Sequence, residues 1–322
     1  MKKLIKNYLL LLVVGLLTVS CSNDDDSSST PVSNTIADFV SNNSNYSSLK
    51  AALDKAGLTS VLAGSDSFTV FAPDNDAFSV FLSANGFLTL NDVPDAVLEQ
   101  VLLNHVVSGV NMSSSLSTGY VKTLAEESTT SNKIDMYINT SSGVQINGDA
   151  QVVQADISVD NGVIHAVNKV IGLPTVVTFA TADSTFSTLV AALTRESSFT
   201  YVSTLSTGNG TSPAPFTVFA PTNNAFADLL VELEVSSLND IATATLEATL
   251  NTHVVGGANI LSNTLTNGMT VTTLGDTFTI NTTSGVTFTD QNNRSGNVIV
   301  ADVQSANGVI HVIDKVILPQ LN

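Results

Sequence analysis

A segment that occurs twice places the strongest constraint on how this chain can fold. It reads FTVFAPDNDAF at residues 68–78 and FTVFAPTNNAF at residues 216–226. A second segment, NGVIH, stands at residues 161–165 in the first half and at residues 307–311 in the second. The two segments keep nearly the same separation in each half, so the chain is one domain written twice.

The length of the chain agrees with this duplication. A chain of 322 residues is about the size of two average domains, and each half is long enough to bury a core of its own. We expect the first domain to span residues 33–174 and the second residues 175–322, hereafter the first and second copies. The link around residues 173–175 is short, so we expect the two copies to touch.

The order of sequence patterns within a copy predicts the fold class. Apolar residues recur at helical spacing over residues 36–62, and an apolar run at residues 68–71 predicts a buried strand that ends at Pro73. Asp74 is a natural N-cap for the helix that follows. After a further helix that we extend to Val107, residues 120–170 alternate apolar and polar positions. Helices first and strands second predict an α+β fold.

The charge of the chain excludes one class of partner. The formal net charge is −17, which repels phosphate backbones and anionic lipids. We therefore expect no nucleic-acid partner, and we expect partners that are neutral or cationic.

The first 32 residues have the pattern of an export signal and a tether. Lys2, Lys3 and Lys6 precede a short apolar run, which predicts a signal peptide over residues 1–20. Cys21, the only cysteine, follows a small residue and resembles the acylated cysteine of bacterial lipoproteins. The alternative is an ordinary exported protein with an incidental thiol. Acyl chains on Cys21 would attach the protein stably to a membrane.

The segment after Cys21 bears on which side of the membrane the protein faces. Residues 22–26, SNDDD, resemble the acidic tract that sends lipoproteins of Bacteroidetes-type bacteria to the outer face of the outer membrane. The alternative is a solvated tether, a role that residues 21–32 have in either case. We expect a protein that is lipid-anchored in the outer membrane and faces the cell exterior.

Both repeated segments, together with one histidine in each copy, resemble the fasciclin domain family. The family's first box is carried by residues 69–78 and 217–226 and its second by residues 161–170 and 307–316, while His105 and His253 match its mid-domain histidine. The resemblance implies two tandem domains, each a compact β-sandwich or wedge flanked by short helices. It also implies an adhesive or scaffolding role at a cell surface.

The motifs that the family associates with integrin binding are incomplete in this chain. The tyrosine of the family's Tyr-His pair is replaced by Asn104 and Thr252, so integrin binding is not carried over. The family's Asp-Ile pair is matched by Asp156 and Ile157 but is Asp-Val in the second copy. We keep Asp156 and Ile157 as possible ligand contacts. The alternative is that Asp156 caps a turn and Ile157 belongs to the core.

Four histidines are the main candidates for chemistry. Two per copy are too few for a zinc site unless carboxylates such as Asp156 or Asp302 complete the set, and such a metal-dependent hydrolase remains the third alternative. Because the histidines recur in both copies, we expect structural rings hydrogen-bonded to backbone. No serine elbow is present, and we expect no metal, no cofactor and no enzymatic activity. The histidines are His105, His165, His253 and His311.

One loop distinguishes the two copies. Residues 46–53 match residues 186–193 at an offset of 140, whereas the FTVF boxes match at an offset of 148. Eight residues are therefore inserted within residues 203–214 of the second copy. The leading hypothesis is a non-enzymatic surface protein that mediates adhesion or matrix and biofilm contacts through proteins or glycans. The alternative is an accessory glycan- or small-ligand-binding lipoprotein of a surface uptake system, with this loop as the lip of its site.

Overall fold

The computed structural model describes residues 33–320. The predictions for the signal peptide (residues 1–20), the acylated Cys21 and the tether (residues 21–32) lie outside these described residues. Within them, no single helix is long and apolar enough to cross a membrane, although one pair, α6 (Val176–Ala182) with residues 184–193, passes by length and composition and is bent by 93°.

The first copy begins with short helices whose ends follow from local sequence. Thr35 forms a capping box with Asp38 at the start of the first helix, and Gly57 ends the second helix in a left-handed conformation. Asp74 accepts a hydrogen bond from the Ala77 N–H, as the sequence predicts. The helices and 3-10 turns are α1 (Ile36–Asn42), η1 (Ser44–Tyr46), α2 (Ser47–Ala56), α3 (Thr59–Leu62), α4 (Asn75–Ala84), η2 (Leu90–Asp92), α5 (Asp95–Leu103) and η3 (Ser113–Ser115).

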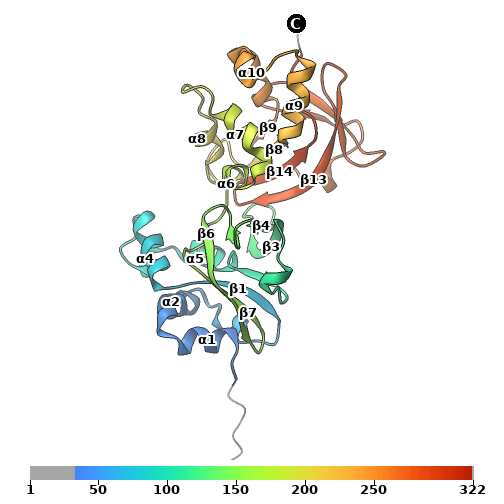
Figure 1. Cartoon of the computed structure of the whole chain (residues 1–322). Coiled ribbons are helices and arrows are strands. Elements are labelled where there is room, and N and C mark those ends of the chain that lie inside the picture. Colours follow the sequence, from blue (N-terminus) through green and yellow to red (C-terminus); the bar gives the residue numbers. More distant parts are fainter. Residues whose placement is uncertain (1–32, 321–322) are drawn as a thin grey trace, which may run out of the picture. The chain divides into compact units, whose positions relative to one another are not determined.

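Seven strands of the first copy form one sheet in the order β2-β1-β7-β6-β5-β4-β3. Figure 1 shows α1, α2, α4 and α5 together on one side of these strands. The repeated segments become neighbours, because β1 pairs in parallel with β7. The strands are β1 (Phe68–Pro73), β2 (Val106–Ser108), β3 (Gly119–Glu126), β4 (Lys133–Asn139), β5 (Gln145–Ile146), β6 (Ala150–Val159) and β7 (Gly162–Val167).

The second copy repeats this architecture in a sheet of order β10-β11-β12-β13-β14-β8-β9. Strand β14 pairs in parallel with β8, as β7 does with β1. Besides α6, its helices and turns are η4 (Ser184–Phe186), α7 (Ser187–Leu193), α8 (Tyr201–Leu205), α9 (Asn223–Glu232), η5 (Leu238–Asp240), α10 (Thr243–Asn251) and η6 (Ser262–Thr264). Its strands are β8 (Phe216–Pro221), β9 (Val254–Gly256), β10 (Thr270–Thr272), β11 (Thr277–Asn281), β12 (Thr287–Thr289), β13 (Ser295–Ser305) and β14 (Gly308–Ile313).

The pairing of the two boxes explains a glycine in each copy. A Cβ on Gly162 would lie 2.0 Å from the Phe68 carbonyl oxygen, and one on Gly308 would lie 2.2 Å from that of Phe216. Both distances are far below van der Waals contact, so only glycine allows the two strands to approach. The NGVIH box is therefore a packing requirement of the parallel strand pair.

The α+β prediction is confirmed, with one difference in order. Residues 106 and 107, which we assigned to the end of a helix, instead begin β2 and pair with β1. Strand β1 lies inside the sheet between β2 and β7, although helices precede and follow it in sequence. Apolar side chains pack on both sides of these strands: Val70 and Ile164 belong to a cluster with the helices, while Phe71 and Val167 belong to a second cluster among the strands.

Candidate functional site

The mid-domain histidines lie at the same place in each copy, just after α5 and α10. The Ile171 N–H donates to Nε2 of His105 at 2.8 Å, so Nδ1 carries the proton and donates to the Val101 carbonyl at 2.7 Å. His253 repeats this with Thr249 and Ile317 at 2.7 and 2.9 Å. Each ring therefore ties a helix end to the segment that follows the last strand of its copy.

The second-box histidines also have both ring nitrogens occupied. Nε2 of His165 donates to the Asn111 carbonyl at 2.9 Å, and Nδ1 accepts the Asp156 N–H at 3.2 Å. In the second copy, His311 contacts the Ile260 carbonyl and the Asp302 N–H at 2.8 and 3.4 Å. Both side chains are fully buried.

Burial sets the protonation state of these rings. It lowers the pKa of His105 and of His253 from 6.5 to about 4, and it also lowers that of His311. His105, His253 and His311 are therefore neutral at pH 7, as the acceptor role of one nitrogen in each ring requires. Among residues 33–320, no group of three or more His, Cys, Asp or Glu side chains is placed to hold a metal ion.

Asp156 lies at a bulge of β6 in the left-handed region, with φ of 62°. Its carboxylate accepts hydrogen bonds from the Ser113 N–H at 2.7 Å and from the Ser113 hydroxyl at 2.5 Å, and these bonds lower its pKa. Asp302 has φ of 61° and makes the same two contacts with Ser262. The side chain of Ile157 is half-buried against the helical cluster.

The inserted loop of the second copy contacts the first copy through Asn209. The Asn209 side-chain amide donates to the Glu127 carboxylate and, at 2.8 Å, to the Ala306 carbonyl. Glu127 is only 1 % exposed, and it also accepts hydrogen bonds from Thr129 and Thr130. In the structure, the loop that we considered as the lip of a ligand site joins the two copies.

Two buried carboxylates at this joint were not found from the sequence. Besides Glu127, Asp135 is 4 % exposed and accepts hydrogen bonds from Lys122 Nζ at 2.7 Å and from the Gln304 N–H at 2.6 Å. Burial raises the pKa of Asp135, against the effect of Lys122. Their partners are 82 and 169 residues distant along the chain, and no local pattern signals such pairs.

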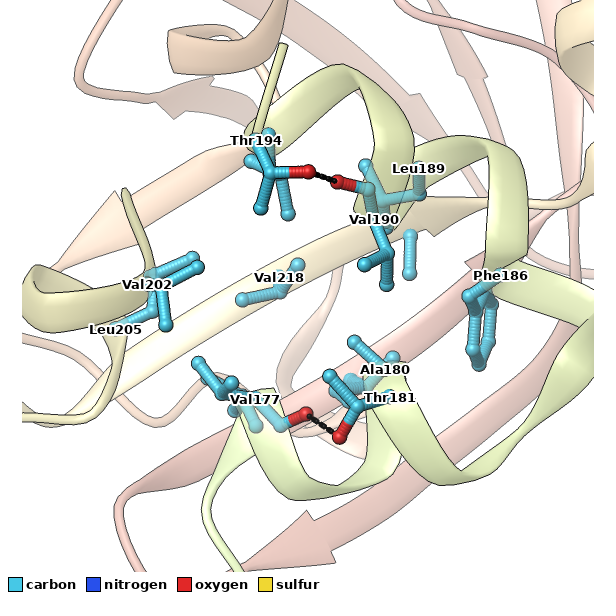
Figure 2. A pocket seen from close by; sticks show the side chains of 14 residues that line it. Val177, Ala180, Thr181, Phe186, Leu189, Val190, Thr194, Val202, Leu205 and Val218 are labelled. Atoms are coloured by element: carbon cyan, nitrogen blue, oxygen red, sulfur yellow. Dashed lines mark hydrogen bonds between the residues drawn. The ribbon is translucent and has the colours of Figure 1, made fainter. Parts of the chain in front are cut away.

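A small cavity of about 40 Å³ lies in the second copy among α6, α7 and α8 (Figure 2). Its walls are apolar except for two threonines. The hydroxyls of Thr181 and Thr194 donate to the carbonyls of Val177 and Val190 in their own helices, at 2.9 and 2.8 Å. The cavity therefore presents no free polar group to orient a sugar, although α8 leads directly into the inserted loop.

These features define a class of protein: a tandem α+β repeat in which two histidines and one aspartate per copy are bonded into the framework. The chain belongs to the fasciclin domain family, since the model of the Fasciclin domain matches residues 44–174 and 184–319. Both copies match separately, so the resemblance seen in the boxes extends over most of each copy.

Several relatives are similar to this chain. Protein sll1483 of Synechocystis sp. is 34% identical over 42% of this chain and 72% of its own length. The transforming growth factor-beta-induced protein ig-h3 of Sus scrofa is 29% identical over 80% of this chain, and human periostin is 26% identical over 90%. This chain spans only 35% and 32% of the length of these two relatives.

The structural comparison supports the fold. The structure of a FAS1 domain pair from the insect cell adhesion molecule Fasciclin I matches with a TM-score of 0.52, covering 88% of this chain and 98% of that chain. The sequence identity is 18%, so this match shows the fold alone.

Proposed function

We propose that this chain is a non-enzymatic, lipid-anchored surface protein that mediates adhesion or matrix and biofilm contacts. The observation that carries the proposal is the pair of tandem fasciclin domains, folded like a domain pair of the cell adhesion molecule Fasciclin I. The partners of such a protein are proteins or glycans at the cell surface.

The non-enzymatic part of the proposal is supported by the state of the histidines. All four rings use both nitrogens in hydrogen bonds with backbone groups. A ring held in this way is unable to bind a metal or transfer a proton without breaking the contacts that fix it. The recurrence of the same contacts in both copies supports a framework role.

The anchor is supported by the sequence alone. Cys21 follows the apolar run and precedes residues 22–26, SNDDD, so we propose acylation of Cys21 and display on the outer face of the outer membrane. In this arrangement the polar residues 22–32 hold the two domains away from the lipid.

Two experiments test the proposal separately. Deletion of the gene should reduce attachment of the cells to protein- or glycan-coated surfaces, and the full-length gene should restore it. The full chain with Cys21→Ser should appear in the medium or periplasm instead of the membrane fraction, and it should lose surface protease sensitivity. Unaltered attachment after deletion would remove the adhesive part, whereas membrane retention of the Cys21→Ser protein would remove the anchor.

A further inference from the structure

The first copy carries a surface groove between α4 and α5. Its volume is about 560 Å³, within the range of sites that hold ligands or partner side chains. The walls are mainly apolar, and Asp149 and Lys169 lie at its edge. Among the apolar lining residues are Val80, Phe81, Ala84, Val97, Val101 and Leu173.

In the second copy an ion pair occupies the equivalent place. Arg294 binds Glu232 at the end of α9 through two bonds, Nε to Oε1 at 2.6 Å and Nη2 to Oε2 at 2.7 Å. The same guanidinium donates to Asp290 at 2.8 Å and to the Val316 carbonyl at 2.9 Å. Arg294 therefore connects α9 to the segment that follows β14.

Both halves of this ion pair are absent from the first copy. At the offset of 148 that aligns the helices, Ala84 stands in place of Glu232. At the offset of 146 that aligns the NGVIH boxes, Gly148 stands in place of Arg294. Ala84 lines the groove of the first copy with only a methyl group, where the second copy has the Glu232 carboxylate that binds Arg294.

The residues at the rim of the groove are apolar in the first copy and polar in the second. In the first copy Val80 is 58% exposed, Leu88, beside the lining residue Phe87, is 93% exposed, and Val97 is 44% exposed. The matching residues of the second copy are polar: Asp228, Ser236 and Thr245. The fold is the same in both copies, so it does not require apolar residues here. Clustered exposed apolar residues that the fold does not need mark an interaction surface.

The charges around the groove indicate what kind of partner fits it. Asp149 is 68% and Asp95, at the start of α5, is 81% exposed at the side chain. The two nearby cations, Lys55 and Lys169, are paired with these same carboxylates. With a net charge of −17 on the whole chain, the long-range field favours a cationic partner.

From this geometry we infer that the groove between α4 and α5 binds an amphipathic helix of a partner protein, with its apolar face on Val80, Ala84 and Val97 and basic residues at its edges. A helix laid between two helices buries a stripe of apolar side chains, which matches the shape and chemistry of the groove. This inference rests on the proposed adhesive function and names the class of partner for it.

Other occupants fit the observations less well. Sugars are bound by exposed aromatic faces and polar groups, and the aromatic rings here, Phe81 and Phe87, are partly buried against the core. A membrane surface calls for free lysines and arginines around the apolar patch. A second copy of this chain would place acid against acid, since its exposed Val231 lies beside Glu232 and Glu234.

A designed peptide tests the inference on the purified full chain. The probe is a helix of leucine and lysine about 14 residues long, roughly four turns, with one tryptophan on its apolar face. The chain contains no tryptophan, so the emission of the peptide reports binding without background. The test variants graft second-copy residues, Ala84→Glu and Val97→Thr, and the matched control is Val231→Ser on α9.

We expect the unmodified protein and Val231→Ser to bind the peptide equally, and each graft to weaken binding by about tenfold or more. Ala84→Glu adds a negative charge, so electrostatic attraction of the lysine-containing peptide alone predicts tighter binding. Unchanged or tighter binding to this variant would overturn the inference. A peptide with serine in place of leucine should not bind. Val97→Thr changes an exposed residue and gives the answer if Ala84→Glu fails to fold.

Two further readouts separate the alternatives. If light scattering shows a dimer that Ala84→Glu dissociates, a second copy is the occupant and the partner helix is wrong. If deletion of the gene abolishes cell attachment but the grafted variants restore it fully, the groove inference fails while the adhesive function stands. Groove-dependent peptide binding together with unaltered attachment after deletion would reject the adhesive function instead.

Discussion

Arg294 and Glu232 form a two-bond ion pair between residues 62 positions apart, and the pair is present in only one of two otherwise equivalent domains. The guanidinium also neutralises Asp290, whose side chain is fully buried. The Arg294–Glu232 ion pair fixes the end of α9 to the hairpin between β12 and β13. It also shows what the open groove of the first copy lacks.

Removal of Arg294 should destabilise the second copy strongly. The variant Arg294→Met leaves the buried carboxylate of Asp290 without its cation, and we expect a loss of about 3 kcal/mol in the free energy of unfolding. Glu232 is 39% exposed at the side chain, so Glu232→Gln should cost about 1 kcal/mol or less. Urea unfolding of both variants checks the difference, and equal costs would contradict the assignment of Asp290 as the main partner.

The glycines of the NGVIH boxes should tolerate no side chain. Gly162→Ala and Gly308→Ala each place a methyl group about where a carbonyl oxygen already lies, so we expect losses of more than about 2 kcal/mol. Gly208→Ala is the matched control, because nothing lies within 4 Å of its Cβ position. Thermal unfolding distinguishes the variants. A Gly162→Ala protein as stable as the control would exclude the close approach of β1 and β7.

Acid should weaken the protein before its carboxylates titrate. The folded pKa of His105 and of His253 is about 4, below the unfolded value of 6.5, so unfolded chains bind more protons between these values. The stability from keeping both rings neutral is complete above pH 6.5 and is lost as the pH falls toward 4. It is on the order of 3 kcal/mol for each ring.

The pH window makes this prediction specific to histidine. Carboxylates act mostly below about pH 5, so a fall in the free energy of unfolding between pH 6.5 and 5 reports the rings. Urea unfolding at successive pH values measures it. Histidine NMR signals should show that His105 and His253 do not titrate above pH 5, and titration of these two rings near 6.5 would refute the buried neutral state.

Asp156 and Asp302 should matter for stability to a similar degree. Alanine at either position loses both hydrogen bonds to serine and must adopt a left-handed backbone, which alone costs about 1–2 kcal/mol. Asparagine tolerates that backbone better, so Asp156→Asn should be the milder change. Chemical unfolding of the paired variants measures the costs. If Asp156→Ala leaves stability unaltered while Asp302→Ala lowers it, Asp156 is free to serve as a ligand contact.

The cavity in Figure 2 should accept a larger side chain. At the offset of 140, Val40 of the first copy matches Ala180, one of the residues that line the cavity. We expect Ala180→Val to raise the free energy of unfolding by about 0.5–1 kcal/mol. Ala192→Val, at a fully buried position of α7, is the control and should destabilise by overpacking. A loss of stability from Ala180→Val would show that the space is already filled or mobile.

Much of the fold was predictable because its signals are local. Asp74 caps α4 and Gly57 ends α2, and in each case the residue type acts on the backbone within a few positions. Strand β2 was missed because Val106 and Val107 continue the apolar pattern of α5. Only the pairing with Thr69 and Val70 of β1 decides that these residues are extended.

The sequence by itself determined the duplication, the α+β class and the family, because repeated boxes and apolar periodicity are written in consecutive residues. Only the tertiary structure decided that the inserted loop meets Glu127 through Asn209. It also decided that Arg294 binds Glu232 in the second copy, whereas the matching Ala84 lines an open groove in the first. These are contacts between residues far apart along the chain, and their energies depend on distance and burial, which the order of residues does not state.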